Sequence, residues 1–195
     1  MERQLEELAQ LFLKFPGIGR RQAARLAYFI LTQPEHYVKS LAQTLLDARS
    51  HAHTCDRCMR IFEGNGNRCS ICTDDSRDQS TMVVVEKSQD IDSFAKTDYR
   101  GLFFVLNGLI PIVQKSTVAG TNAQILINRA QSDTTLNEII LAFPLTPNGE
   151  HTDIAIREML GSGKKISSLG RGLSTGAELE YADTASLNAS LKKRE

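Results

Sequence analysis

The four cysteines of the 195-residue chain have the spacing of a metal site. They form two Cys-x2-Cys pairs separated by ten residues: Cys55, Cys58, Cys69 and Cys72. Each pair can direct two thiolates at one ion, and two pairs complete the tetrahedral set that structural zinc prefers. We therefore expect one structural zinc ion per chain, with His51 and His53 as exposed bystanders. Disulfides are a weaker alternative, because the N-terminal sequence favours the cytosol and the rest of the chain contains no cysteine. A redox pair is weaker still, because it would need only one Cys-x2-Cys.

A second group of chemically informative residues lies in the string FPGIGRRQAARLA near the N-terminus. This string resembles the helix-hairpin-helix motif of proteins that bind DNA without sequence specificity. Glycines let the backbone approach a phosphate closely, and the first amides of the following helix favour an anion. Arginines in a first turn are unfavourable for the helix dipole alone, so an anionic partner explains them. We interpret five residues as contacts to the DNA backbone: Gly17, Gly19, Arg20, Arg21 and Arg25. The alternative is an ordinary helical hairpin with a solvated basic face.

Three helices are expected to position these residues. The first has an apolar stripe at helical spacing, made by Leu5, Leu8, Phe12 and Phe15, and Pro16 stops it. The second runs from about residue 20 to 31, and the third from about 36 to 49. The side of the third helix expected to face the core consists of Val38, Leu41, Ala42, Leu45 and Leu46.

After Ser80 the pattern changes to alternating strands and helices. The strands are expected at residues 82–85, 102–106, 138–142 and 165–169, and the helices at 90–96, 122–130 and 150–160. The continuous apolar run at 82–85 is typical of a strand that is covered on both faces. Alternation of strands and helices favours a largely parallel sheet with crossover helices.

The alternating region resembles the Toprim domain of topoisomerases and primases. In that domain a glutamate closes the first strand, and further carboxylates after a later strand hold a divalent ion for phosphodiester chemistry. Here Glu86 and Glu150 remain as carboxylates, whereas Pro144, Thr146 and Asn148 stand at the other acidic positions. Because proline cannot ligate a metal and threonine is a poor ligand for Mg²⁺, we expect no catalytic residue. Glu86 and Glu150 are interpreted as partner contacts, with ordinary structural carboxylates as the alternative.

The order of these parts resembles the RecR family of bacterial recombination mediators. The C-terminal sequence GRGLSTGAELEYADTASL strengthens the resemblance, and its LEYAD segment at residues 179–183 is the most distinctive part. The predicted fold class is multidomain α+β. The expected domains are a helix-hairpin-helix domain at 1–53, a four-cysteine zinc ribbon at 54–79, an α/β Toprim domain at 80–175 and a C-terminal segment at 176–195.

The resemblance implies a DNA-binding mediator without catalytic activity, which works with RecO and RecF to help RecA load onto single-stranded DNA. It also implies a homo-oligomer, a ring-shaped tetramer that encircles DNA. Lys+Arg and Asp+Glu balance at 23 each, so any basic surface must be local. The charged, amphipathic sequence MERQLEELAQ does not suggest export, so we expect the cytoplasm, associated with the nucleoid. The alternatives are a metal-dependent Toprim nuclease or topoisomerase-like enzyme, and a zinc-ribbon adaptor that touches only proteins.

Overall fold

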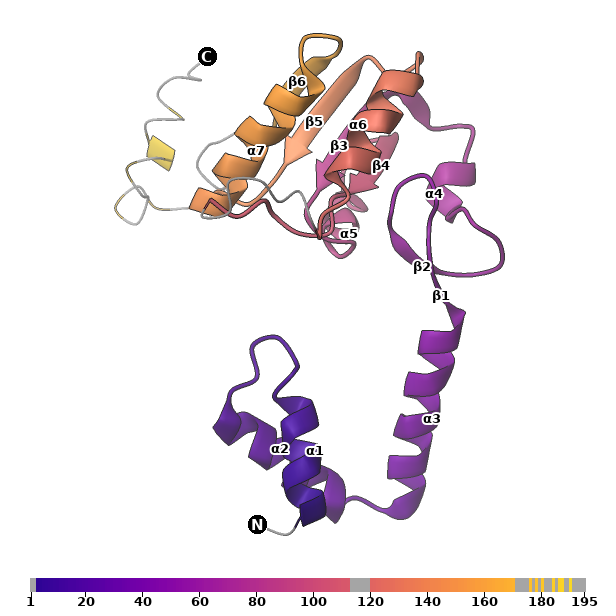
Figure 1. The fold of residues 1–195 in the computed structure, drawn as a ribbon, viewed down its shortest axis with the longest axis vertical. Helices are drawn as coiled ribbons and strands as arrows, with labels where there is room; N and C mark the ends of the chain where they lie inside the picture. Colours follow the sequence, from indigo (N-terminus) through magenta and orange to yellow (C-terminus); the bar gives the residue numbers. More distant parts are fainter. Residues whose placement is uncertain are drawn as a thin grey trace. The chain divides into compact units, whose positions relative to one another are not determined.

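The computed structural model describes residues 3–112 and 120–170, together with the isolated positions 176, 178, 180, 184, 186, 187 and 190. The chain forms two compact units, Met1–Ala52 and His53–Glu195 (Figure 1). Apart from Glu180, the LEYAD segment at 179–183 lies outside the described residues. None of the helices in the described ranges is long and apolar enough to cross a membrane.

The N-terminal unit contains three helices: α1 (Arg3–Phe12), α2 (Arg20–Thr32) and α3 (Glu35–His51). The first two pack against each other through Leu5, Ala9 and Ala27, and Leu8 and Phe12 are partly buried beside them. Small alanines on α2 permit this close contact, because they add no bulk between the helix axes. The predicted stripe on α1 is therefore correct up to Phe12.

Two expectations for the N-terminal unit are wrong. Phe15 does not continue the α1 stripe, because α1 ends three residues earlier and the Phe15 side chain is 54% exposed. The predicted core side of α3 is also not a core, since α3 has no buried residue and Leu45 and Leu46 are 61% and 66% exposed. Helical spacing of apolar residues shows that one face favours burial, but it does not show what covers that face.

The cysteine segment begins the second unit. A two-stranded sheet of β1 (Ala52–Thr54) and β2 (Ile61–Glu63) carries the first cysteine pair between its strands. The short helix α4 (Ser70–Thr73) begins immediately after Cys69, at the second pair. The four cysteines form a small buried cluster of their own, against which Phe62 and Ile71 pack.

A four-stranded sheet forms the body of the second unit. Its strands are β3 (Asp78–Val85), β4 (Gly101–Val105), β5 (Glu138–Ala142) and β6 (Lys165–Ser168). The strand order is β4-β3-β5-β6, and every pair is parallel, which confirms the predicted parallel arrangement. The connecting helices are α5 (Asp90–Phe94), α6 (Ala123–Ser132) and α7 (Pro147–Leu160). The prediction missed the first residues of β3 because they are polar and do not belong to the apolar run. Helix α7 begins before residue 150 because Thr146 caps it.

Both faces of this sheet are covered. Met82 and Val84 of β3 face one buried cluster, which includes Leu126 of α6 and Ile156 of α7. These two helices cover one face of the sheet (Figure 1). The intervening side chains of β3 face a second cluster that contains Ile91 of α5. Alternate residues of a strand point to opposite faces, so a run of apolar residues is what a sheet covered on both sides requires.

Candidate metal centre and nucleic-acid interface

The structure brings the four predicted cysteines together at one point. Their sulfur atoms all lie within 4.8 Å of one another, all four residues are buried, and none forms a disulfide. The sulfurs of Cys58 and Cys69 are 3.6 Å apart. A zinc ion with Zn–S bonds of about 2.3 Å needs sulfurs about 3.8 Å apart, so the cluster has the size of a tetrahedral metal site.

Backbone hydrogen bonds shape the first Cys-x2-Cys pair into a tight turn. The amide of Met59 donates to the carbonyl of Cys55 at 3.0 Å, and the amide of Cys55 donates to the carbonyl of Arg60 at 2.8 Å. Met59 has a φ of 62°, a left-handed conformation that is unusual for a residue with a side chain. Sequence reasoning missed Met59, because methionine gives no signal for this backbone conformation.

A group of four thiols in one buried cluster favours a bound cation. Hydrogen bonding to Cys69 and Cys72, together with burial, raises the pKa of the Cys58 thiol far above its usual range. Without a cation the Cys58 thiol therefore keeps its proton, whereas a bound metal ion would replace that proton and offset the negative charge of the thiolates in this buried site.

Arg129 of α6 supports the same conclusion. Its Nη1 donates to the carbonyl of Arg57 at 2.8 Å, whereas its buried Nε and Nη2 have no hydrogen-bond partner among the described residues. Burial lowers the pKa of Arg129, and the nearby Cys72 and Cys58 oppose that shift. One divalent ion and four thiolates carry two negative charges, so a buried guanidinium beside them is electrostatically favourable. Sequence reasoning missed Arg129, which is far from the cysteines in the chain.

The two histidines near the cysteines do not belong to the cluster. The Nδ1 atom of His51 lies 2.7 Å from the carbonyl of Asp47, and the ring of His53 packs near Phe62. Within the described residues, the group that can hold a metal ion consists of the four cysteines alone.

The predicted phosphate contacts surround the N-terminus of α2. Gly17 has a φ of 78°, which glycine adopts without strain, and Gly19 occupies the N-cap position without a side chain to cap the helix. Space above both glycines is open. Three exposed arginines, which form no ion pair in the described part of the chain, follow in the first two turns: Arg20, Arg21 and Arg25. Open amides beside unpaired guanidinium groups can hold a phosphate.

The Toprim positions lie at the carboxyl ends of two neighbouring strands. Glu86 follows β3 directly, and one carboxylate oxygen lies 3.2 Å from Nζ of Lys87. Beyond β5, the hydroxyl of Thr146 accepts a hydrogen bond from the amide of Gly149 at 3.2 Å and so caps α7. Glu150 is exposed in the first turn of the same helix. The structure therefore gives Thr146 a capping role in place of metal ligation.

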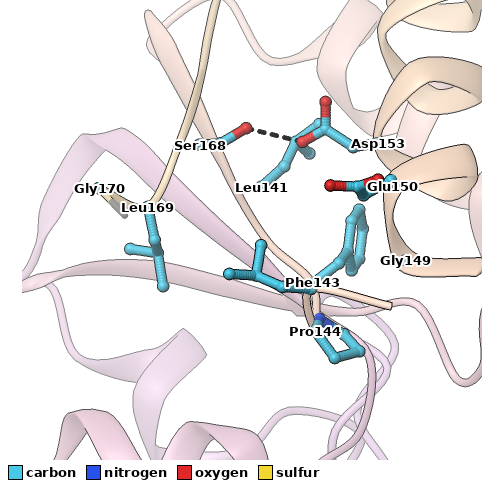
Figure 2. A pocket seen from close by; sticks show the side chains of 10 residues that line it. Leu141, Phe143, Pro144, Gly149, Glu150, Asp153, Ser168, Leu169 and Gly170 are labelled. Atoms are coloured by element: carbon cyan, nitrogen blue, oxygen red, sulfur yellow. Dashed lines mark hydrogen bonds between the residues drawn. The ribbon is translucent and has the colours of Figure 1, made fainter. Parts of the chain in front are cut away.

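A hollow of about 270 Å³ adjoins this strand end (Figure 2). Phe143 and Leu169 form part of its apolar lining, and Glu150 and Asp153 line it with carboxylates. Gly149 is required here, because a Cβ atom at this position would overlap the carbonyl oxygen of Pro144. The Asp153 carboxylate is already held by Arg157 and accepts a hydrogen bond from the hydroxyl of Ser168 at 2.7 Å. Sequence reasoning found Glu150 but missed this hollow.

Fold and site together define a modular protein in which a helix-hairpin-helix unit, a four-cysteine metal site and a Toprim sheet follow one another. Residues 5–49 match the family model for the RecR helix-hairpin-helix, and residues 80–170 match the model for the Toprim domain. The chain belongs to the RecR family of recombination proteins, as the resemblance indicated.

Three relatives illustrate the similarity. The chain is 37% identical over 194 residues to recombination protein RecR of Levilactobacillus brevis, covering 97% of this chain and 96% of the relative. It is 36% identical to RecR of Porphyromonas gingivalis, covering 98% and 92%. For RecR of Chloroherpeton thalassium the identity is 37%, and the coverage is 97% and 95%.

Proposed function

We propose that this chain is a DNA-binding mediator of recombinational repair that acts without catalytic activity. In this role it works with RecO and RecF to help RecA load onto single-stranded DNA. The observation that carries the proposal is the N-terminus of α2, where open amides lie beside exposed arginines that form no ion pair with any other described residue. Contacts of this kind bind phosphates and carry no base identity, so the binding is independent of sequence.

The ion of the cysteine cluster is proposed to be zinc, one per chain, with Cys55, Cys58, Cys69 and Cys72 as its ligands. Four thiolates at tetrahedral separations are the donor set of structural zinc sites. The ion would stabilise the turn between β1 and β2, because a small segment with little core depends on its metal for folding.

The proposed assembly is a ring-shaped tetramer around DNA. Apolar side chains on α2 and α3 support association, since Phe29, Leu31, Leu45 and Leu46 are largely exposed in the single chain. A symmetric ring would also explain how a chain with a net charge of zero binds DNA, because each copy contributes one local basic patch to the DNA that the ring encircles.

Replacing Arg21 and Arg25 by alanine tests the DNA contact. We expect affinity to fall similarly for all DNA sequences, and the slope of log K against log salt to become shallower by about 0.9 for each duplex phosphate that is no longer bound. Fluorescence anisotropy with labelled DNA at several salt concentrations measures both quantities. The matched control replaces Arg3 and Lys39, which are exposed in the same unit and paired with Glu7 and Glu35. Equal affinities and slopes in the double variant and the control would contradict the proposal.

The variants Glu86→Gln and Glu150→Gln test the roles proposed for the two carboxylates. We expect DNA binding to change less than twofold, because neither group belongs to the proposed phosphate contact, and binding to RecO or RecF to weaken. Pull-down and anisotropy measurements distinguish the two effects. If the wild-type protein instead nicks DNA with Mg²⁺ and Glu86→Gln abolishes that activity, the chain is a Toprim nuclease and the proposal is wrong.

A further inference from the structure

A second hollow, this one basic, lies in the unit formed by His53–Glu195, and none of the cysteine ligands lines it. Its volume is about 230 Å³, and three of its lining residues are arginines: Arg60, Arg77 and Arg100. They come from three different segments, directly before β2, before β3 and before β4. Asp92 is the one carboxylate among the described lining residues. The hollow therefore has an excess of positive charge in a chain that is neutral as a whole.

Arg77 is held in a fixed position. Its Nε donates to the carbonyl of Gly101 at 3.0 Å, and its guanidinium carbon lies 5.7 Å from the centre of the Phe103 ring. Its terminal nitrogens and the exposed Arg100 form no ion pair within the described ranges. Arg60 meets Asp92 at 3.8 Å, the outer limit of an ion pair. Asp74 lies near enough to Arg77 to interact with it electrostatically, but the Arg77 terminal nitrogens and the Arg100 guanidinium keep donors that an anionic ligand can use.

Aromatic rings make up much of the apolar lining of the hollow. Phe94, Tyr99 and Phe103 contact one another edge to face, with ring centres between 5.2 and 6.0 Å apart. Phe103 is buried in β4, and the hydroxyl of Tyr99 donates to the carbonyl of Leu102 at 2.9 Å. These contacts fix the rings before any ligand arrives, so binding costs little side-chain entropy.

We propose that this hollow binds single-stranded DNA, with the arginines on a phosphate and a base against the Arg77 plane and the half-buried rings of Phe94 and Tyr99. Each nucleotide combines an anion with a flat ring, which matches the two halves of the lining. An acidic peptide would satisfy the arginines but would leave the rings uncovered at most of its residues. In a duplex the base faces are already stacked, so only a single strand can supply them.

A neighbouring hollow extends the proposed path. It has a volume of about 390 Å³, shares Arg60 and Asp92 with the first, and adds polar groups from Lys87, Ser88 and Asn107. A strand longer than one nucleotide can therefore continue from one hollow into the other. The inference rests on the proposed DNA-binding function and adds a second contact, in the other unit and selective for single strands.

The test compares the Arg77→Ala/Arg100→Ala variant of the full chain with a control that removes two charges from the same unit. The control is Arg68→Ala/Lys165→Ala, whose side chains are exposed and paired with Asp56 and Glu138. The probes are a labelled oligothymidine and a duplex of equal length. We expect the variant to lose about tenfold in affinity for the single strand, because stacking and a phosphate contact disappear together, and less than twofold for the duplex. The control should match the wild type.

Two further measurements keep the test decisive. Arg100→Glu changes an exposed side chain alone, so it should fold normally and weaken single-strand binding even if the Arg77 variant is unstable. Ultraviolet crosslinking of oligobromodeoxyuridine should label the peptide that contains Phe94 and Tyr99. Unchanged single-strand affinity in Arg100→Glu, or crosslinks confined to other peptides, would overturn the inference. If these substitutions weaken binding of an oligoglutamate peptide but leave DNA binding unchanged, the inference is also overturned, in favour of an acidic protein partner.

The outcomes also separate this site from the proposed α2 contact. Loss of single-strand affinity only in the Arg77/Arg100 variant supports the hollow and contradicts the α2 contact. Loss of affinity for both probes only in the Arg21/Arg25 variant supports the α2 contact and overturns the hollow.

Discussion

The Cys58→Ser variant is expected to lose its bound metal and the folded structure of the cysteine segment. Removal of one thiolate opens the tetrahedral set, and in small metal sites the binding free energy is folding free energy, about 10–16 kcal/mol for zinc-finger peptides. Even a modest fraction of that energy is comparable with the total stability of a small domain. We therefore expect a lower Tm and less than one-tenth of the wild-type zinc content, measured by thermal unfolding and elemental mass spectrometry.

The loss should spread into the Toprim sheet, because the metal-binding turn is bonded to it. The amide of Val105 in β4 donates to the carbonyl of Cys58 at 2.8 Å, and Arg129 of α6 donates to the carbonyl of Arg57. If the turn unfolds, the amide of Val105 and the buried guanidinium of Arg129 lose these partners, at about 1–3 kcal/mol each. Hydrogen exchange should therefore increase at the end of β4 as well as in the cysteine segment.

A matched control is His53→Ala, which changes an exposed residue close to the cysteines that is not part of the cluster. It should keep one zinc per chain and the wild-type Tm. Treatment of the wild type with a strong chelator should reproduce the Cys58→Ser result. A Cys58→Ser protein with full zinc content, or a wild-type protein whose cysteines form disulfides by mass spectrometry, would show that the proposed ligand set is wrong.

The sequence predicted the features whose signal is local. Cysteine spacing identified the cluster, and the apolar runs located β5 at its observed bounds and the parallel arrangement of the sheet. Spacing is sufficient in these cases because tetrahedral coordination and strand pairing impose short, regular patterns on the chain. The same reasoning placed Glu86 at the end of a buried strand, where the structure has it.

The features that the sequence did not reveal depend on contacts between distant segments. Arg129 reaches the metal-binding turn from a helix 72 residues further along the chain, and the hydroxyl of Thr152 joins the amide of Ile110 to α7. Gly149 is needed because of one carbonyl oxygen, not because of a turn pattern. In each case the residue type has many common uses, and only the packed structure selects one of them.

The α3 helix shows the opposite error, in which a correct pattern was assigned to the wrong partner. Its apolar residues recur at helical spacing, yet none is buried in the part of the chain that the structure describes. Such a face remains exposed in a monomer at the cost of unfavourable contact with water, and monomeric proteins seldom expose large apolar patches. In the proposed ring a second copy of the chain covers this face, which would explain why the apolar residues of α3 recur at helical spacing.

Replacing Leu45 and Leu46 by glutamate should therefore dissociate the proposed tetramer. Burial of a leucine side chain contributes about 1.5–3 kcal/mol, and in a symmetric assembly each substitution is repeated in every interface of the same kind. The fold of the single chain should be unaffected, because both side chains are already exposed in it. Light scattering should give four times the 21.6 kDa chain mass for the wild type and a smaller multiple for the variant.

The control for this experiment places the same charges on the polar side of α3, by Ser40→Glu and Gln43→Glu. Gln43 lies on the polar face, where its amide donates to Asp47 at 2.8 Å, and this variant should keep the wild-type mass. Weaker DNA binding in the dissociated variant, with Arg21 and Arg25 intact, would show that the arginines act together around a ring, because individually weak contacts gain affinity when linked. A wild-type protein that is monomeric at micromolar concentration, or a variant with the same mass as the control, would mean that another partner covers α3.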